Sequence, residues 1–88
     1  MILVCDIEPF KYDQSIFLMQ DNGDIVDDIG KMKLVSLYSF IPSYCHKNNI
    51  STVKLTGNKE YNEMIRNQIK HHEEMLFSDY EPINVEVV

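Results

Sequence analysis

Short apolar runs separated by turn residues fill the first third of the chain, and this pattern is typical of β-strands. Ile2 to Ile7 is an apolar run broken only by Asp6, which indicates a central strand buried on both faces. The polar stretch from Glu8 to Asp13 contains Pro9 and is predicted to turn the chain.

A β-hairpin is predicted next. Ser15 to Gln20 has the composition of a second strand, and Asp24 to Ile29 is its returning partner, closed by Gly30. The intervening Asn22-Gly23 pair favours a tight turn, because both residues tolerate positive φ. Two-residue and three-residue loops place the carboxylates of the returning strand on opposite faces, so the pattern leaves the register open.

From Lys31 onward the apolar residues recur at helical spacing, and Asn48 and Asn49 make a favourable helix end. Pro42 lies inside this pattern and is predicted to kink or split the helix, because proline removes a backbone donor and crowds the preceding turn. His46 has no obvious partner along the sequence and is predicted to cap the helix end.

Ile50 to Thr56 is rich in β-branched residues and is predicted to be a strand. Gly57 then turns the chain into a second helix, for which Asn58 is a plausible N-cap. Asp79 to Pro82 ends that helix, and Ile83 to Val88 is predicted to be the last strand. The buried stripe expected for the second helix comprises Tyr61, Met64, Ile65, Ile69, His72, Met75 and Leu76.

The element order is therefore β-β-β-α-β-α-β, and the length of 88 residues suits one domain spanning residues 1–88. Three antiparallel strands followed by two right-handed crossovers give an α/β fold with one mixed five-stranded sheet. We expect the strand order 3-2-1-4-5.

Charge is distributed unevenly along this chain, whose formal net charge is −6. Residues 1–30 hold seven carboxylates and a single cation, Lys11, whereas the carboxylates and cations of residues 31–88 balance. Such a surface repels nucleic acid and anionic membranes and attracts basic partners. The partner-binding residues predicted on this basis are Asp21, Asp24, Asp27 and Asp28.

Other features bound the class of protein. No apolar run approaches the ~20 residues of a membrane span, and the start of the chain lacks the basic region of a signal peptide, so we expect a cytoplasmic protein. Cys5 and Cys45 are predicted to be small core residues in a reducing compartment, with a Cys5–Cys45 bridge as the alternative. The absence of alanine and the abundance of lysine, asparagine and isoleucine suit an AT-rich coding sequence and favour a phage or mobile-element origin.

The element order, with Asp6 near the end of the first strand, resembles the ribonuclease H-like superfamily, which includes Holliday-junction resolvases and the halves of actin-like ATPases. The resemblance spans nearly the whole chain and is topological. It is carried by Val4-Cys5-Asp6-Ile7, by the hairpin from Ile16 to Val26, and by Val53 to Gly57 leading into a helix.

This resemblance implies a nuclease in which further carboxylates join Asp6 to hold two divalent cations. The helix from Lys31 to Lys47 contains no carboxylate, and Ile50 to Gly57 offers only Lys54 before Asn58. The actin-like ATPases need a glycine-bearing phosphate loop after the first strand, and Glu8 to Asp13 contains no glycine. We therefore expect a protein without catalytic residues, metal or cofactor.

The function predicted is a small binding or assembly protein that offers its acidic hairpin to a basic protein or to a second copy of itself. One alternative is a nuclease dependent on Mg²⁺ or Mn²⁺, with Asp6, Asp27 or Asp28, and Glu60 as its ligands. Another is an acidic decoy that occupies a DNA-binding groove. The run His71-His72-Glu73-Glu74 is predicted to be a polar surface near a helix end, with a His71–Glu74 metal pair as its alternative.

Overall fold

A computed structural model describes all 88 residues and has the predicted element order. The strands and helices are β1 (Ile2–Ile7), β2 (Asp13–Met19), β3 (Ile25–Lys33), α1 (Leu34–Asn48), β4 (Thr52–Gly57), α2 (Lys59–Leu76) and β5 (Asn84–Val87). The fold is α/β with one mixed sheet. Neither helix combines the length and the apolar character that a membrane span requires.

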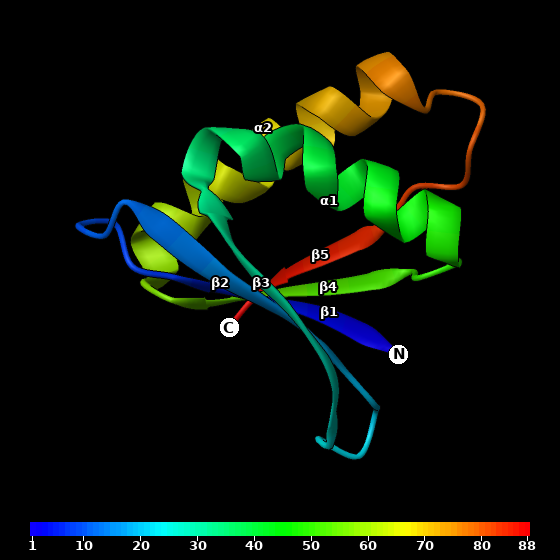
Figure 1. Cartoon of the computed structure of the whole chain (residues 1–88). Helices are drawn as coiled ribbons and strands as arrows, with labels where there is room; N and C mark the ends of the chain where they lie inside the picture. The colour runs from blue at the N-terminus through cyan, green and yellow to red at the C-terminus, as the bar shows by residue number, and fades with distance from the viewer.

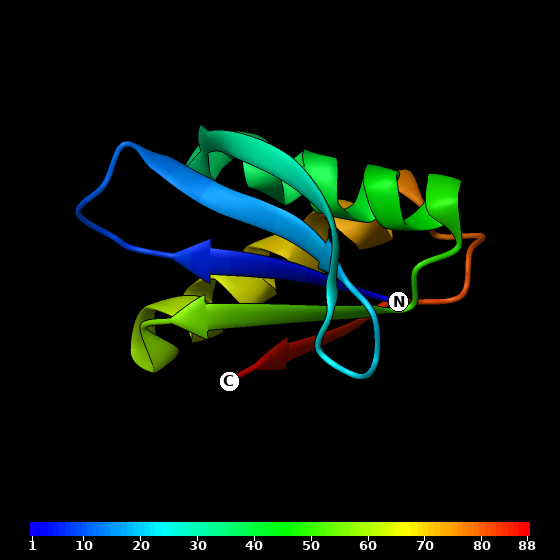
Figure 2. The same ribbon diagram turned by 60° about the horizontal axis from the view of Figure 1, so that its bottom comes forward.

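The sheet has the strand order β3-β2-β1-β4-β5, which confirms the expected order. β1 is central, antiparallel to β2 and parallel to β4, and β4 is parallel to β5. Both helices cover the same face of the sheet, and no helix covers the other face (Figure 1, Figure 2). Two right-handed crossovers that step in the same direction across a sheet require this two-layer arrangement.

The hydrophobic core lies between the sheet and the helices. In β1, Leu3, Cys5 and Ile7 alternate into this layer, as the period of a strand dictates. Cys5 and Cys45 are both free and buried, which confirms them as core residues. Burial raises the pKa of the Cys45 thiol to about 12 and that of the Cys5 thiol further still, so both stay protonated at neutral pH.

The hairpin differs from the prediction in the length of its second strand. β3 continues through Gly30 to Lys33, so the expectation that Gly30 closes this strand is wrong. Gly30 has φ 117°, and the register shifts beside it, which accommodates an extra residue without ending the ladder. The structure also fixes the open register, because Asp27 pairs with Leu18 and Asp28 pairs with Phe17.

Pro42 does not split α1, which runs without interruption from Leu34 to Asn48. Pro42 is buried together with Leu37, Ile41 and Cys45 on the face that packs on the sheet. This tertiary packing offsets the backbone hydrogen bond that proline removes. The predicted helix end is confirmed, since Asn49 adopts a left-handed conformation with φ 58° and the Ile50 amide donates to the Cys45 carbonyl at 2.9 Å.

The buried face of α2 differs from the predicted stripe. Met64, Met75 and Leu76 are exposed, and Tyr61 and His72 are only half-buried. The buried positions are Asn62, Ile65, Ile69 and Glu73. The predicted stripe is wrong because two of the inward positions, Asn62 and Glu73, are polar. Each makes a hydrogen bond in its buried position, and Asn62 Nδ2, for example, donates to the Thr56 carbonyl at 2.9 Å.

Gly57 is predicted to be the least replaceable glycine of the chain. It ends β4 with φ 105°, and a Cβ built there would overlap the carbonyl oxygen of Ile7 in the neighbouring strand. Gly57→Ala should lower the free energy of unfolding by about 3 kcal/mol, through backbone strain and displacement of β1.

Gly23→Ala is the matched control, because Gly23 has φ 96° but no atom lies within 4 Å of its Cβ position. This variant should lose about 1 kcal/mol, the cost of the left-handed backbone alone. Urea unfolding measures both values, and equal losses would contradict the close approach of β1 and β4 at Gly57.

Candidate functional site

Asp6 lies at the end of β1, between Ser15 of β2 and Thr56 of β4. Its side chain is half-buried, and Thr56 Oγ1 donates to Asp6 Oδ1 at 2.9 Å. Strand alternation directs this carboxylate to the face that no helix covers, since Cys5 and Ile7 face the core. The structure thus gives Asp6 a hydroxyl partner from the neighbouring strand.

The other carboxylates of the nuclease alternative lie in different places. Asp6 pairs with Ser15, which pairs with Lys31, so the β3 residue level with Asp6 is a cation. Asp28 pairs with Phe17, farther along the hairpin, and Glu60 lies exposed in the first turn of α2. No group of three or more histidine, cysteine, aspartate or glutamate side chains is arranged to hold a metal ion. His71 and Glu74 are therefore not joined by a third side chain that could complete a metal site.

The acidic residues of the hairpin are exposed to solvent. Asp21 lies 3.5 Å from the amino group of Met1. Asp24 accepts a hydrogen bond from Asn22, and Asp28 accepts one from the Gly30 amide. Asp24, Asp27 and Asp28 form no ion pair with a lysine, arginine or histidine. Their charges are therefore not neutralised within the molecule.

A second polar cluster lies where α1, α2 and the segment before β5 meet. Its centre is Glu73, whose side chain is only 4 % exposed. Lys70 Nζ donates to Glu73 Oε1 at 2.7 Å, and the Ile83 amide donates to Glu73 Oε2 at 2.9 Å. His46 Nε2 lies 2.8 Å from the same Oε2. One carboxylate thus connects both helices to the chain that enters β5.

The prediction that His71-His72-Glu73-Glu74 forms a polar surface is wrong for Glu73. Glu73 continues the inward row of Ile65 and Ile69 at intervals of four residues, and that spacing places it against the sheet layer. His46 also has a partner, so its interpretation as an isolated helix cap is wrong. The row of Ile65, Ile69 and Glu73 is the one signal in the sequence that could have identified this buried carboxylate.

The charge state of Glu73 fixes the proton on His46. Burial raises the pKa of Glu73, but hydrogen bonds from Lys70, the Ile83 amide and His46 outweigh it, so the pKa lies below its usual value. Glu73 is therefore ionised at neutral pH and has no hydrogen to donate. His46 Nε2 must carry the shared hydrogen, and the neutral imidazole keeps its lone pair on Nδ1.

Two aromatic rings cover His46. The centre of its imidazole lies 4.8 Å from the centre of the Phe77 ring and 4.9 Å from that of Tyr80. Lys70 Nζ also donates to the Ile83 carbonyl at 2.6 Å. These contacts hold the segment between α2 and β5 over the polar cluster.

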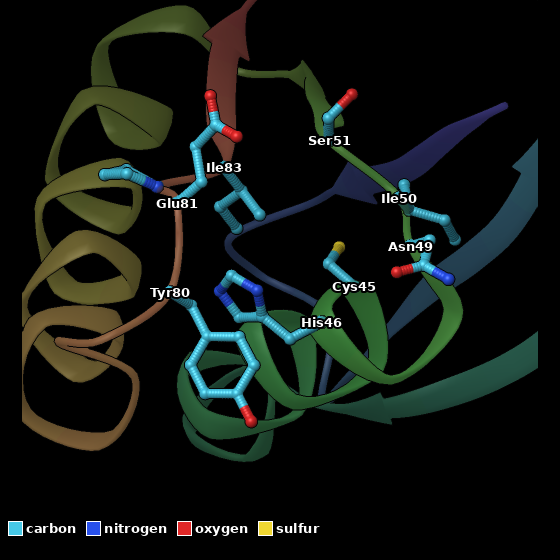
Figure 3. Close-up of a pocket in the computed structure, with 9 residues that line it drawn as sticks. Cys45, His46, Asn49, Ile50, Ser51, Tyr80, Glu81 and Ile83 are labelled. Carbon is cyan, nitrogen blue, oxygen red and sulfur yellow. The ribbon is translucent and has the colours of Figure 1, made fainter.

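A hollow of about 530 Å³ opens beside His46, at the C-terminal end of α1. Asn49 and Ser51, which follow α1, line it on one side, and Tyr80 and Glu81 line it on the other (Figure 3). Glu73 and Lys70 do not line this hollow. The geometry places a histidine, oriented by a buried carboxylate, in the wall of a solvent-filled recess.

We predict that Glu73 makes stability depend on acid pH. A carboxyl group whose pKa falls on folding stabilises the folded state. This contribution is complete above the pKa of the unfolded chain, 4.5 here, and is lost as the pH falls through the lower pKa of the folded state. Glu73→Gln should remove this part of the pH dependence and lower the free energy of unfolding at pH 7 by about 3 kcal/mol.

Urea unfolding between neutral and acid pH measures this effect. Glu74→Gln is the matched control, because Glu74 is the exposed neighbour on the same helix and has the same charge. It should keep the wild-type pH dependence and lose little stability. A Glu73→Gln variant that loses stability with acid as steeply as the wild type would contradict the assignment.

The chain matches no protein-family model, no curated protein and no solved structure. These comparisons neither confirm nor contradict the ribonuclease H-like resemblance. Membership of that superfamily stays a prediction that rests on topology alone, and fold likeness transfers function poorly.

Proposed function

We propose that this protein is a small, non-catalytic binding or assembly protein that takes a basic segment of another protein on its hairpin. The contact surface is the acidic edge, defined here as residues Asp24 to Asp28 at the start of β3. The observation that supports it is the set of three carboxylates, Asp24, Asp27 and Asp28, that have no ion pair within the molecule.

The position of the acidic edge favours a partner. β3 is the outermost strand of the sheet on the hairpin side, so its outer side is open. Ile25 and Val26 lie between the carboxylates with 65 % and 45 % of their surface exposed. A partner with alternating basic and apolar side chains would meet both kinds of group, and unpaired charges of one sign would steer it during approach.

Irregular pairing in β3 decides which groups carry the interaction. The register between β2 and β3 shifts at two places within the hairpin. Bulges interrupt the outward row of backbone donors and acceptors that an added strand would use. We therefore assign the main attraction to the side chains of the acidic edge and not to a long added strand.

A second copy of the chain is the other candidate, because β3 also carries Lys31 and Lys33. Two β3 strands that meet antiparallel around Ile29 would place Asp27 of each copy opposite Lys31 of the other. Sedimentation velocity distinguishes the two. A dimer lost in Lys31→Glu/Lys33→Glu and regained when Asp27→Lys/Asp28→Lys is added would assign the partner to a second copy. A monomer at all concentrations would exclude it.

No contact favours the nuclease centred on Asp6 or the acidic decoy, and both stay predictions. The phage or mobile-element origin and the cytoplasmic location stay predictions as well, since they rest on residue usage and on the start of the sequence.

To test the acidic edge, an acetylated octapeptide of alternating lysine and valine is titrated into the protein, and the backbone-amide NMR signals are monitored. We expect the largest shifts at residues 24–28, and affinity should fall at least about tenfold in Asp24→Asn/Asp27→Asn/Asp28→Asn. The reason is that the triple variant removes the unpaired charges without changing side-chain size.

The matched control is Glu60→Gln/Glu74→Gln/Glu86→Gln, which removes three exposed charges elsewhere. It should change the affinity much less. Equal losses in the two triple variants would show attraction to net charge alone and would contradict a defined binding surface.

A further inference from the structure

His46 has one ring nitrogen that the fold leaves without a partner. Its side chain is only 10 % exposed, and its sole hydrogen bond joins Nε2 to Glu73. In Figure 3 the two ring nitrogens point in opposite directions, one toward α2 and the other toward the hollow and Cys45. His46 lines the hollow, so a ligand there that supplies a hydrogen can bond to this nitrogen.

The surroundings of this nitrogen favour a positively charged donor. The hollow lies at the C-terminal end of α1, where unsatisfied carbonyl groups form the negative pole of the helix. Glu81 lies in the wall and has no ion pair. The ring of Tyr80 offers a face on which a cation can rest.

No cation of the protein competes for this space. No lysine or arginine lines the hollow. Lys70, the lysine of the polar cluster, is already bonded to Glu73 and to the Ile83 carbonyl. Inorganic metal ions are a poorer fit, because His46, Cys45 and Glu81 do not form a ligand group. Anions would meet the negative helix end.

We propose that the hollow beside His46 binds an organic cation of the ammonium or guanidinium class. His46 Nδ1 accepts a hydrogen bond from the cation, Glu81 supplies the opposite charge, and Tyr80 packs against it. Glu73 acts at one remove, because it accepts the hydrogen on Nε2, and in the neutral ring this leaves Nδ1 as the acceptor. This site lies apart from the acidic edge and does not depend on the proposed function.

The cation has two possible sources, a free diamine or guanidine, or a basic side chain of a protein. Agmatine represents the first, and acetyl-Gly-Arg-Gly-amide represents the second. Each is titrated at neutral pH into the labelled protein, with the backbone amides and the His46 imidazole nitrogens followed by NMR. Acetyl-Gly-Leu-Gly-amide serves as the uncharged control.

We expect saturable shifts at His46 Nδ1 and at the amides of Asn49, Ser51 and Glu81. Glu81→Lys should weaken binding at least about fivefold, because it reverses the one unpaired charge in the wall. Glu86→Lys is the matched control, since it makes the same charge change at an exposed position outside the hollow, and it should alter the affinity less than about twofold. The Asp24→Asn/Asp27→Asn/Asp28→Asn variant should bind the cation as the wild type does.

Saturation by agmatine alone would assign the site to small cations, and saturation by the arginine peptide would assign it to a protein side chain. The proposal is overturned if neither probe moves the His46 nitrogen. It is also overturned if Glu81→Lys and Glu86→Lys weaken binding equally, or if the largest shifts fall on the acidic edge. If the protein binds the octapeptide but neither agmatine nor the arginine peptide, the cation site is refuted and the proposed function of the acidic edge still stands.

Discussion

One buried carboxylate holds together the parts of this fold that the sheet does not. Glu73 accepts hydrogen bonds from Lys70 of its own helix, from His46 of α1 and from the Ile83 amide at the entrance to β5. A buried charge is stable only when it is fully bonded, so these groups are constrained together. The path of the chain before β5 and the orientation of His46 follow from this requirement, and the contact adds to the hydrophobic packing of the two helices.

The molecule has two separate polar surfaces, one on the hairpin and one in the hollow beside His46. β1, the central strand of the sheet, and β4 approach so closely at Gly57 that a side chain does not fit. The hairpin extends from this centre with exposed carboxylates that bond only to neighbouring groups of the same hairpin or to the chain start. The hollow lies on the helical side, at the end of α1 (Figure 3). A compact core therefore supports two separate polar surfaces, and each presents unneutralised negative charge.

Element order, strand order, the end of α1 and the N-cap of α2 could be predicted, because each depends on local signals. Asn58 shows this well: its side chain accepts from the Tyr61 amide as an N-cap should. The buried face of α2 could not be predicted, because hydrophobicity assigns Met75 and Leu76 to the core and Glu73 to the surface. One of the partners that keep Glu73 buried is His46, 27 positions away in sequence. The row of Ile65, Ile69 and Glu73 indicates an inward position, but it does not reveal this partner. Pro42 is similar, since packing on the sheet overrides a local helix-breaking preference.

The tautomer of His46 tests the central claim most directly, because it reports whether an ionised Glu73 accepts from Nε2. Long-range proton–nitrogen NMR correlation at neutral pH distinguishes the two ring nitrogens without any substitution. The account predicts a hydrogen on Nε2 and a bare Nδ1 in the neutral ring. A neutral ring with its hydrogen on Nδ1 would contradict the contact between Glu73 and His46 and the role of that contact in organising the helices, β5 and the hollow.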